Sequence, residues 1–327
     1  MKGIWIAVAL VFAVACGGLG YMISKRKPVY AQVTTDRPKA AEVEDIIEQF
    51  LKVDPKLIIA KETGRLATGL KELRGVAVGP DDRVYVVGDK ALVILGSDGT
   101  QLKKVDIEKA PTCLAVGPDS TIYIGLIDQV QVFDKDGVKR SAWPKAGPSD
   151  WITSIAATDK EVFVADFGNK TVVRYDKAGK ILGRLGNAGS LAGTGKFEVP
   201  SPYFDVAIDA SGKPWVAHTG RQRLENFKDD NSLDTTWGKQ GNTIEGFSGC
   251  CNPSHFAVMK DGRFVTAEKG LPRVKVHKSS GELIGVVAAP KDFEKGIHGL
   301  DVAVDSKDRI LVVDPATSTV RIYALNP

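Results

Sequence analysis

Side chains that could ligate a metal or transfer a proton recur at one position of a repeated pattern. A step of apolar residue, alanine and apolar residue occurs six times, around Ala77, Ala115, Ala156, Ala207, Ala257 and Ala303. The residues two places before these alanines are Gly75, Cys113, Ser154, Asp205, His255 and Asp301. Four of the six are Cys, Asp or His, which are metal-ligand and acid–base types. The pattern therefore predicts a polar site wherever these positions converge.

A second candidate is the pair of adjacent cysteines, Cys250 and Cys251, shortly before His255. Three roles are open: a vicinal disulfide that stiffens the loop, two thiolates that bind a soft metal such as copper together with His255, and a redox pair that exchanges electrons with a partner. Because adjacent side chains diverge, the sequence favours structural or redox use over chelation of one tetrahedral ion.

The elements that must position these residues are short strands. Apolar runs bounded by Gly and Asp recur in each unit, for example at residues 84–87, 91–95, 122–124, 130–133, 162–166 and 172–176. Units of roughly 40 to 50 residues with several strands each are typical of propeller blades. The sequence predicts an all-β, six-bladed β-propeller over residues 56–327. The chain stops three strands into the last blade, so residues 56–61 are expected to supply its outer strand.

Two stretches resemble the NHL repeat family. Residues 164–180 read VADFGNKTVVRYDKAGK, and residues 195–200 read GKFEVP. The resemblance covers residues 57–327 and implies a propeller, but the family's propellers include scaffolds, lyases and lactonases. The family commonly has Gly at the position of Gly75 and Asp at the positions of Asp166 and Asp314. His218 and Glu268, in the same register as these aspartates, therefore depart from the family pattern.

Propeller geometry is expected to place both registers on the face built by the loops that enter each blade. Six-bladed relatives such as the peptide-amidating lyases hold a metal at this end of the axis. The resemblance thus implies a site for a divalent ion, Zn, Ca or Cu, held by His255, Asp205, Asp301 and Cys113. In the other interpretation, the two aspartates hydrogen-bond to amides of neighbouring blades, and Cys113 is buried filler.

Further polar residues are predicted to bind a ligand on the same face. Loops on a rigid scaffold are where binding residues concentrate. The predicted ligand-binding residues are His218, Glu268, Lys269, Arg273 and His298.

The N-terminal segment is predicted to carry a targeting signal. Residues 4–23 are uncharged, lie between Lys2 and the basic residues 25–27, and are long enough to cross a bilayer as a helix. Residues 1–27 are predicted to be a retained signal anchor; a lipoprotein signal at Cys16 and a cleaved secretory peptide are the alternatives. Residues 28–55 read as a linker with a short amphipathic helix at 40–51. The propeller is expected on the periplasmic side, although basic residues 25–27 favour the opposite orientation.

The composition and the absence of several known motifs argue against particular classes of function. The net charge of +4 comes from scattered Lys and Arg, without a basic stripe, so no nucleic-acid partner is expected. The chain has no Gly-x-Ser-x-Gly elbow, Walker loop, dinucleotide fingerprint or Cys-x-x-Cys-His motif. The favoured function is a membrane-tethered module that binds a protein or a small ligand at its channel mouth. The alternatives are a metal-dependent lyase or hydrolase, and an accessory subunit of a redox complex.

Overall fold

The computed structural model describes residues 51–186, 196–295 and 297–327. All of them belong to one compact unit, Glu48–Pro327. The predicted signal anchor and nearly all of the predicted linker helix lie outside the described residues. Within the described ranges, no helix has the length and apolar character that a bilayer crossing requires.

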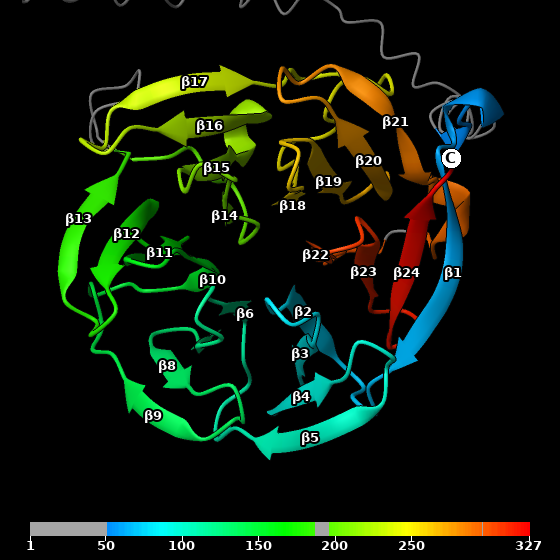
Figure 1. The fold of residues 1–327 in the computed structure, drawn as a ribbon. Helices are drawn as coiled ribbons and strands as arrows, with labels where there is room; N and C mark the ends of the chain where they lie inside the picture. The colour runs from blue at the N-terminus through cyan, green and yellow to red at the C-terminus, as the bar shows by residue number, and fades with distance from the viewer. Residues whose placement is uncertain (1–50, 187–195, 296) are drawn as a thin grey trace, which may run out of the picture. The chain divides into compact units, whose positions relative to one another are not determined.

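Six four-stranded antiparallel sheets surround a common axis, so the predicted six-bladed propeller is confirmed (Figure 1). Blade one comprises β2 (Leu73–Val78), β3 (Val84–Gly88), β4 (Ala91–Leu95) and β5 (Gln101–Asp106). Blade two comprises β6 (Cys113–Val116), β7 (Ile122–Gly125), β8 (Val130–Phe133) and β9 (Lys139–Ala142). Blade three comprises β10 (Ile152–Ala157), β11 (Glu161–Asp166), β12 (Thr171–Asp176) and β13 (Ile181–Leu185).

The later blades follow the same order from the axis outward. Blade four comprises β14 (Val206–Ile208), β15 (Pro214–His218), β16 (Arg223–Phe227) and β17 (Leu233–Trp237). Blade five comprises β18 (His255–Val258), β19 (Phe264–Glu268), β20 (Arg273–His277) and β21 (Leu283–Ala288). Blade six comprises β22 (Val302–Val304), β23 (Ile310–Asp314), β24 (Thr319–Leu325) and, from the start of the described chain, β1 (Ala60–Ala67). The described ranges also contain three short 3-10 helices: η1 (Pro55–Leu57), η2 (Thr219–Arg221) and η3 (Pro290–Asp292).

The middle strands are apolar on both faces because each blade packs against two neighbours. On β3, Val84 and Val86 contact the core shared with blade six, whereas Tyr85 and Val87 contact the core shared with blade two. Successive side chains of a strand point to opposite faces, so one apolar run serves two cores. Six such cores, one for each blade interface, account for the continuous apolar runs in the sequence.

The ring is closed by pairing of the first and last strands. β1 pairs antiparallel with β24, from Ala60 opposite Leu325 to Ala67 opposite Thr319. The closure is therefore as predicted, but the strand begins later than residues 56–61. Pro55 opens a 3-10 turn, in which Asp54 Oδ1 accepts a hydrogen bond from the Lys56 amide at 2.9 Å. This local turn keeps residues 55–57 out of the sheet.

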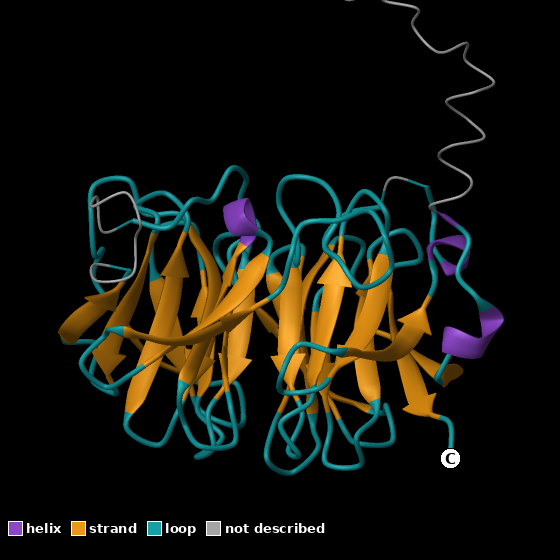
Figure 2. Ribbon diagram, turned by 90° about the horizontal axis from the view of Figure 1, so that it is seen from above, coloured by secondary structure: helices purple, strands orange, loops and turns teal. Residues whose placement is uncertain are grey.

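Loops gather at the two ends of the strands (Figure 2). One set connects strands within a blade, in part through Asp-x-x-Gly turns; between β8 and β9, Asp134 Oδ1 accepts the Asp136 amide at 3.0 Å, and Gly137 has a φ of 72°. Only a residue that tolerates positive φ fits there, which explains the repeated glycine. The other face carries the loops that enter each blade and lead to its innermost strand.

Candidate functional site

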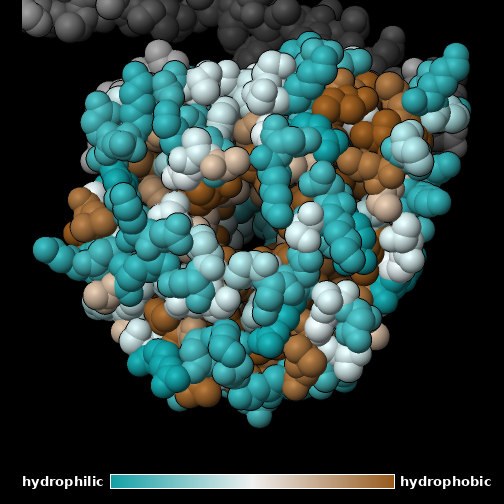
Figure 3. Space-filling view, viewed as in Figure 1, coloured by the Kyte–Doolittle hydropathy of each residue, from teal (hydrophilic) through white to brown (hydrophobic). Residues whose placement is uncertain are grey.

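The six innermost strands lie side by side around a central channel with a volume of about 240 Å³. A space-filling view shows the hollow at the centre of the ring (Figure 3). Its lining includes the predicted residues Cys113, Ser154, Asp205, His255 and Asp301. The repeat register therefore brings these side chains together.

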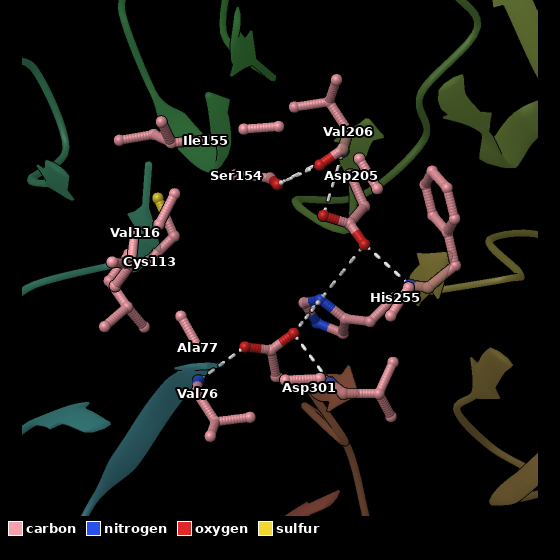
Figure 4. A pocket seen from close by; sticks show the side chains of 18 of the residues that line it. Val76, Ala77, Cys113, Val116, Ser154, Ile155, Asp205, Val206, His255 and Asp301 are labelled. Atoms are coloured by element: carbon pink, nitrogen blue, oxygen red, sulfur yellow. Dashed lines mark hydrogen bonds and ion pairs between the residues drawn. The ribbon is translucent and has the colours of Figure 1, made fainter. Parts of the chain in front are cut away.

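His255 lies between two carboxylates in this channel (Figure 4). Its Nδ1 atom is 3.4 Å from Asp301 Oδ1 and 3.9 Å from Asp205 Oδ2. The three residues open the innermost strands of blades four, five and six. The channel therefore contains a polar site at the axis, in which a histidine side chain has a carboxylate on each side.

The two aspartates also link neighbouring blades. Asp205 Oδ2 accepts a hydrogen bond from the Phe256 amide at 2.8 Å, and Asp301 Oδ2 accepts one from the Val76 amide at 2.8 Å. The remaining oxygen of each carboxylate accepts the amide of the following residue, at 3.0 Å for Asp205 and 2.9 Å for Asp301. The predicted bonding of these aspartates to amides of neighbouring blades is thus confirmed.

Burial sets the protonation of the channel acids and of the thiol. Burial, with a contribution from Asp205, raises the pKa of Asp301 to about 6, against the opposing effect of His255. Burial raises the pKa of Asp205 as well. Burial raises the pKa of Cys113 to about 12, so this residue is a neutral thiol at physiological pH.

The candidate metal ligands at the axis are largely engaged in hydrogen bonds within the protein. Each carboxylate oxygen of Asp205 and Asp301 already accepts an amide hydrogen bond, and the Cys113 sulfur is protonated. In residues 51–186, 196–295 and 297–327, no group of three or more His, Cys, Asp or Glu side chains is disposed to hold a metal. A metal held by His255, Asp205, Asp301 and Cys113 therefore stays a prediction.

The second register of the repeat lies at the ends of the second strands and comprises Asp166, His218, Glu268 and Asp314. The first three of these side chains hold entry loops. Asp166 Oδ1 accepts the Trp151 amide at 3.0 Å, His218 Nε2 accepts the Glu198 amide at 2.8 Å, and Glu268 Oε2 accepts the Ser248 amide at 2.9 Å. His218 and Glu268 are buried. In place of the expected ligand contacts, His218 and Glu268 share with Asp166 the role of anchoring a loop. Asp314 instead accepts the Ala316 amide of its own turn at 3.1 Å.

Glu268 belongs to a buried ionic cluster with Arg273 and Lys275. Arg273 Nη2 and Lys275 Nζ each lie 2.8 Å from a Glu268 oxygen, and all three side chains are at most 1% exposed. Burial opposes ionisation of Glu268, but Lys275 and Arg273 hold its pKa below the usual value. Lys275 Nζ also donates to the Gly246 carbonyl at 2.8 Å. Arg273, like Glu268, therefore stabilises the loop before the cysteines and does not face the channel mouth.

Above the channel, the entry loops enclose a wider cavity of about 610 Å³, which we call the cup. The cup shares Arg74, Thr112, Thr153 and His255 with the channel, so these residues form its neck. Its wall includes Ile127, Trp151, Tyr203 and His298. Ile127 is 53% exposed and Trp151 is 41% exposed.

One of the predicted ligand-binding residues lines the cup, and a second contacts its wall. His298 lines it, with its ring 6.5 Å from that of Tyr203. Lys269 Nζ lies 5.0 Å from the centre of the Tyr203 ring, within the range of a cation–π contact. Tyr203 also meets the His255 ring edge to face at 6.2 Å.

The sequence reasoning missed the aromatic and cationic wall of the cup. Arg74, Trp151 and Tyr203 each lie one to three residues before a channel position. An aromatic or basic residue placed just ahead of an innermost strand is the signal that could have revealed them.

The adjacent cysteines are both free thiols, with their sulfur atoms 3.1 Å apart. Cys250 is exposed and Cys251 is buried. The structure has no bond between the two sulfur atoms, and the three roles considered for the pair stay predictions.

Comparisons with known proteins agree on the architecture. No protein-family model matches this sequence, and no curated protein is detectably similar to it. A streptogramin B lyase structure aligns with a TM-score of 0.55 at 9% identity, covering 84% of this chain and all of that chain. A protein of unknown function from Bacteroides thetaiotaomicron aligns with a TM-score of 0.57 at 15% identity, covering 82% of this chain and 72% of that one.

A catalytically inactive virginiamycin B lyase from Staphylococcus aureus, in a structure with quinupristin, aligns with a TM-score of 0.52 at 13% identity. That alignment covers 82% of this chain and 88% of the lyase. At such identities the similarity concerns the fold alone. These relatives support a six-bladed propeller of the broad kind to which lyases and other proteins belong, and they leave the NHL assignment as a resemblance.

Proposed function

We propose that this protein is a binding module that takes a small amphipathic anion in the cup. The observation that carries the proposal is the cup itself: a cavity of about 610 Å³ with exposed aromatic and apolar walls above a polar neck. Small-molecule sites are typically cavities of about 300–1,000 Å³ with apolar linings and a few convergent polar groups.

The cup wall suits an aromatic or apolar ligand body. Trp151, Tyr203 and Ile127 offer surfaces that such a body would cover, and exposed apolar groups gain free energy when they leave water. Trp151 is held at its backbone, because its amide donates to the buried Asp166. The wall is therefore preorganised, which lowers the entropic cost of binding.

The neck suits an anionic head group. Arg74 is exposed, and the structure gives its guanidinium one side-chain partner, Glu72, at 3.0 Å. A guanidinium has five N–H donors, so most of them can reach a carboxylate or sulfonate. The hydroxyls of Thr112 and Thr153 donate to backbone carbonyls, at 3.1 Å to Gly125 and 2.6 Å to Phe204, which leaves Arg74 as the principal donor for the ligand.

The alternative of a metal-dependent lyase or hydrolase has less support. The two aspartates among the proposed ligands already accept amide hydrogen bonds, and Glu268 is enclosed by Arg273 and Lys275. The lyases among the structural relatives share only the fold with this chain.

We further propose that the propeller is tethered to a membrane and works on its periplasmic side. The support is the uncharged run at residues 4–23, which is long enough to span a bilayer.

The binding proposal can be tested with 1-naphthoate, an aromatic carboxylate, by calorimetric titration of the full chain. We expect saturable binding that weakens at least about tenfold in Arg74→Ala, because one charge-assisted hydrogen bond contributes roughly 1.5–3 kcal/mol. Trp151→Ala should weaken binding by a similar factor, because it removes an aromatic surface that the ligand covers. Arg74→Ala should also remove any preference for naphthoate over the neutral 1-naphthalenemethanol.

The matched control is Leu182→Ala, which truncates an apolar residue that is 48% exposed on β13, away from the cup. This variant should bind naphthoate like the unaltered protein. Absence of saturable binding, or equal affinity in all four proteins, would overturn the proposal.

A further inference from the structure

The adjacent cysteines form a nucleophilic pair that the cup does not use. Cys250 Sγ and Cys251 Sγ are 3.1 Å apart, and both residues are free thiols. In a disulfide bond the two sulfur atoms are about 2.0 Å apart. The two atoms therefore need to approach by only about 1 Å for a bond to form.

The backbone on both sides of the pair is held by buried hydrogen bonds. On one side, Gln222 Nε2 of blade four donates to the Gly249 carbonyl at 2.8 Å. On the other, Asn252 is 1% exposed; its Nδ2 donates to the Ser248 carbonyl at 2.7 Å, and its Oδ1 accepts the Lys269 amide at 2.9 Å. The loop therefore presents the two thiols in a fixed mutual position, which favours reaction between them.

The two thiols differ in access, and this difference assigns their order in a reaction. Cys250 is exposed, whereas Cys251 is 2% exposed. Burial, with a contribution from Cys250, raises the pKa of Cys251, and the positive charge of Lys269 opposes that rise. A reagent from solution must therefore meet Cys250 first, and Cys251 can react only with what Cys250 has brought in.

We propose that Cys250 and Cys251 are a dithiol–disulfide couple that is oxidised by exchange with an external disulfide. The Cys250 thiolate attacks one sulfur of the disulfide RSSR, forming a mixed disulfide and releasing one RS⁻, which takes up the proton that Cys250 lost. Cys251, losing its proton, then attacks the Cys250 sulfur, forming the vicinal disulfide and releasing the second thiol. Two protein thiols are oxidised by two electrons, and one disulfide is reduced to two thiols.

The test uses the full chain, reduced, freed of reductant and incubated with glutathione disulfide. The protein is then unfolded in the presence of an alkylating reagent, which blocks every remaining thiol, and it is digested with trypsin for mass spectrometry. Cleavage after Lys239 and Lys260 yields peptide 240–260, which holds both cysteines of the pair, while Cys113 lies in a separate peptide, 110–135. We expect peptide 240–260 to become two hydrogens lighter, with neither glutathione nor an alkyl group attached.

Two variants test the order of attack. In Cys251→Ser, the exchange should stop at the first step and leave glutathione on Cys250. In Cys250→Ser, the buried Cys251 should remain unmodified while the protein is folded. Cys113, which is also buried, serves as the internal control for a thiol that the reagent does not reach.

A further comparison distinguishes a dithiol pair that the folded loop positions from two cysteines that are merely adjacent in the sequence. In urea, where the loop no longer holds the thiols together, peptide 240–260 should carry mainly glutathione adducts. The proposal is overturned if the folded wild-type peptide takes up two alkyl groups, if it keeps stable glutathione adducts, or if Cys250→Ser reacts as fast as Cys251→Ser.

Discussion

At the scale of single residues, the channel is governed by carboxylates that serve two purposes. Asp205 and Asp301 each accept two amide hydrogen bonds, one of them from the next blade, and both face His255. Such bonds to a buried charge contribute roughly 1.5–3 kcal/mol each. The same burial penalises the negative charge, and the balance of the two effects makes the channel sensitive to pH.

This balance predicts how stability changes with pH. The raised pKa of Asp301, about 6, means that the folded protein holds this proton more tightly than the unfolded chain does. Folding is therefore favoured as pH falls through about 6 towards about 4, and that gain is lost as pH rises again. Relative to Asp301→Asn, the unaltered protein should gain at most about 3 kcal/mol in free energy of unfolding between pH 7 and pH 4.

Urea unfolding of both proteins at several pH values measures this difference. His255 and Asp205 are present in both proteins, so their titration enters both curves. Parallel pH dependences in the two proteins would contradict the assigned shift of Asp301.

At the scale of elements, strand pairing restricts which residue type can stand opposite a channel residue on the next strand. Cys113 on β6 lies opposite Gly125 on β7. A Cβ atom at position 125 would overlap Cys113 Sγ and would lie 3.0 Å from Ile152 Cγ2. The cysteine in the channel register and the glycine that ends the next strand are thus a complementary pair.

The pair predicts a coupled effect of two substitutions. Gly125→Ala should lower the free energy of unfolding by about 1–3 kcal/mol, because the added methyl group overpacks the site. In a Cys113→Ala background this cost should fall by about half or more, since the clashing sulfur is absent. Denaturant unfolding of the four proteins gives the coupling energy.

Gly64→Ala is the control for this cycle, because a Cβ atom there meets nothing within 4 Å. It should change stability little, with or without Cys113. A full cost of Gly125→Ala in the Cys113→Ala background would show that Cys113 is not the partner.

The same scale shows what sequence reasoning could and could not predict. The strands at 91–95 and 130–133 were placed correctly, because continuous apolar runs between Asp/Gly turns leave little freedom. β1 was misplaced by several residues, because Asp54 and Pro55 form a local turn that competes with the strand. His218 and Glu268 were predicted to bind a ligand because the sequence does not reveal their buried partners. Those partners are Glu225, Arg273 and Lys275, which lie on the neighbouring strands β16 and β20.

The cup could not be predicted from the sequence, for a related reason. Its wall residues come from loops, which have no periodicity to reveal where their side chains point. The convergence of Trp151 and Tyr203 depends on anchors such as Asp166, which only the folded blades bring into place.

At the scale of the whole molecule, six blades form a ring whose closure depends on eight residues of β1. β1 covers the edge of β24, and Arg321 of β24 pairs with Glu62 of β1 at 2.6 Å. An uncovered strand edge exposes unpaired amides and carbonyls and invites aggregation.

Removal of β1 should therefore destabilise the entire propeller. We expect deletion of residues 1–67 to lower the melting temperature by more than 10 °C, roughly the effect of a few kcal/mol, and to cause aggregation. Deletion of residues 1–50, which leaves β1 in place, is the matched control and should melt near the full chain. Calorimetry and light scattering measure the two effects, and similar behaviour of both deletions would contradict the role given to β1.

This closure also has a consequence for biosynthesis. A ribosome makes β1 before any blade and β24 after nearly all of them, so the earliest strand to emerge waits for the latest. Until β24 has been made, the segment of β1 has no strand of its own blade with which to pair. The price of joining the two ends is thus a long wait for the earliest strand, during which the unclosed intermediate is exposed to misassembly.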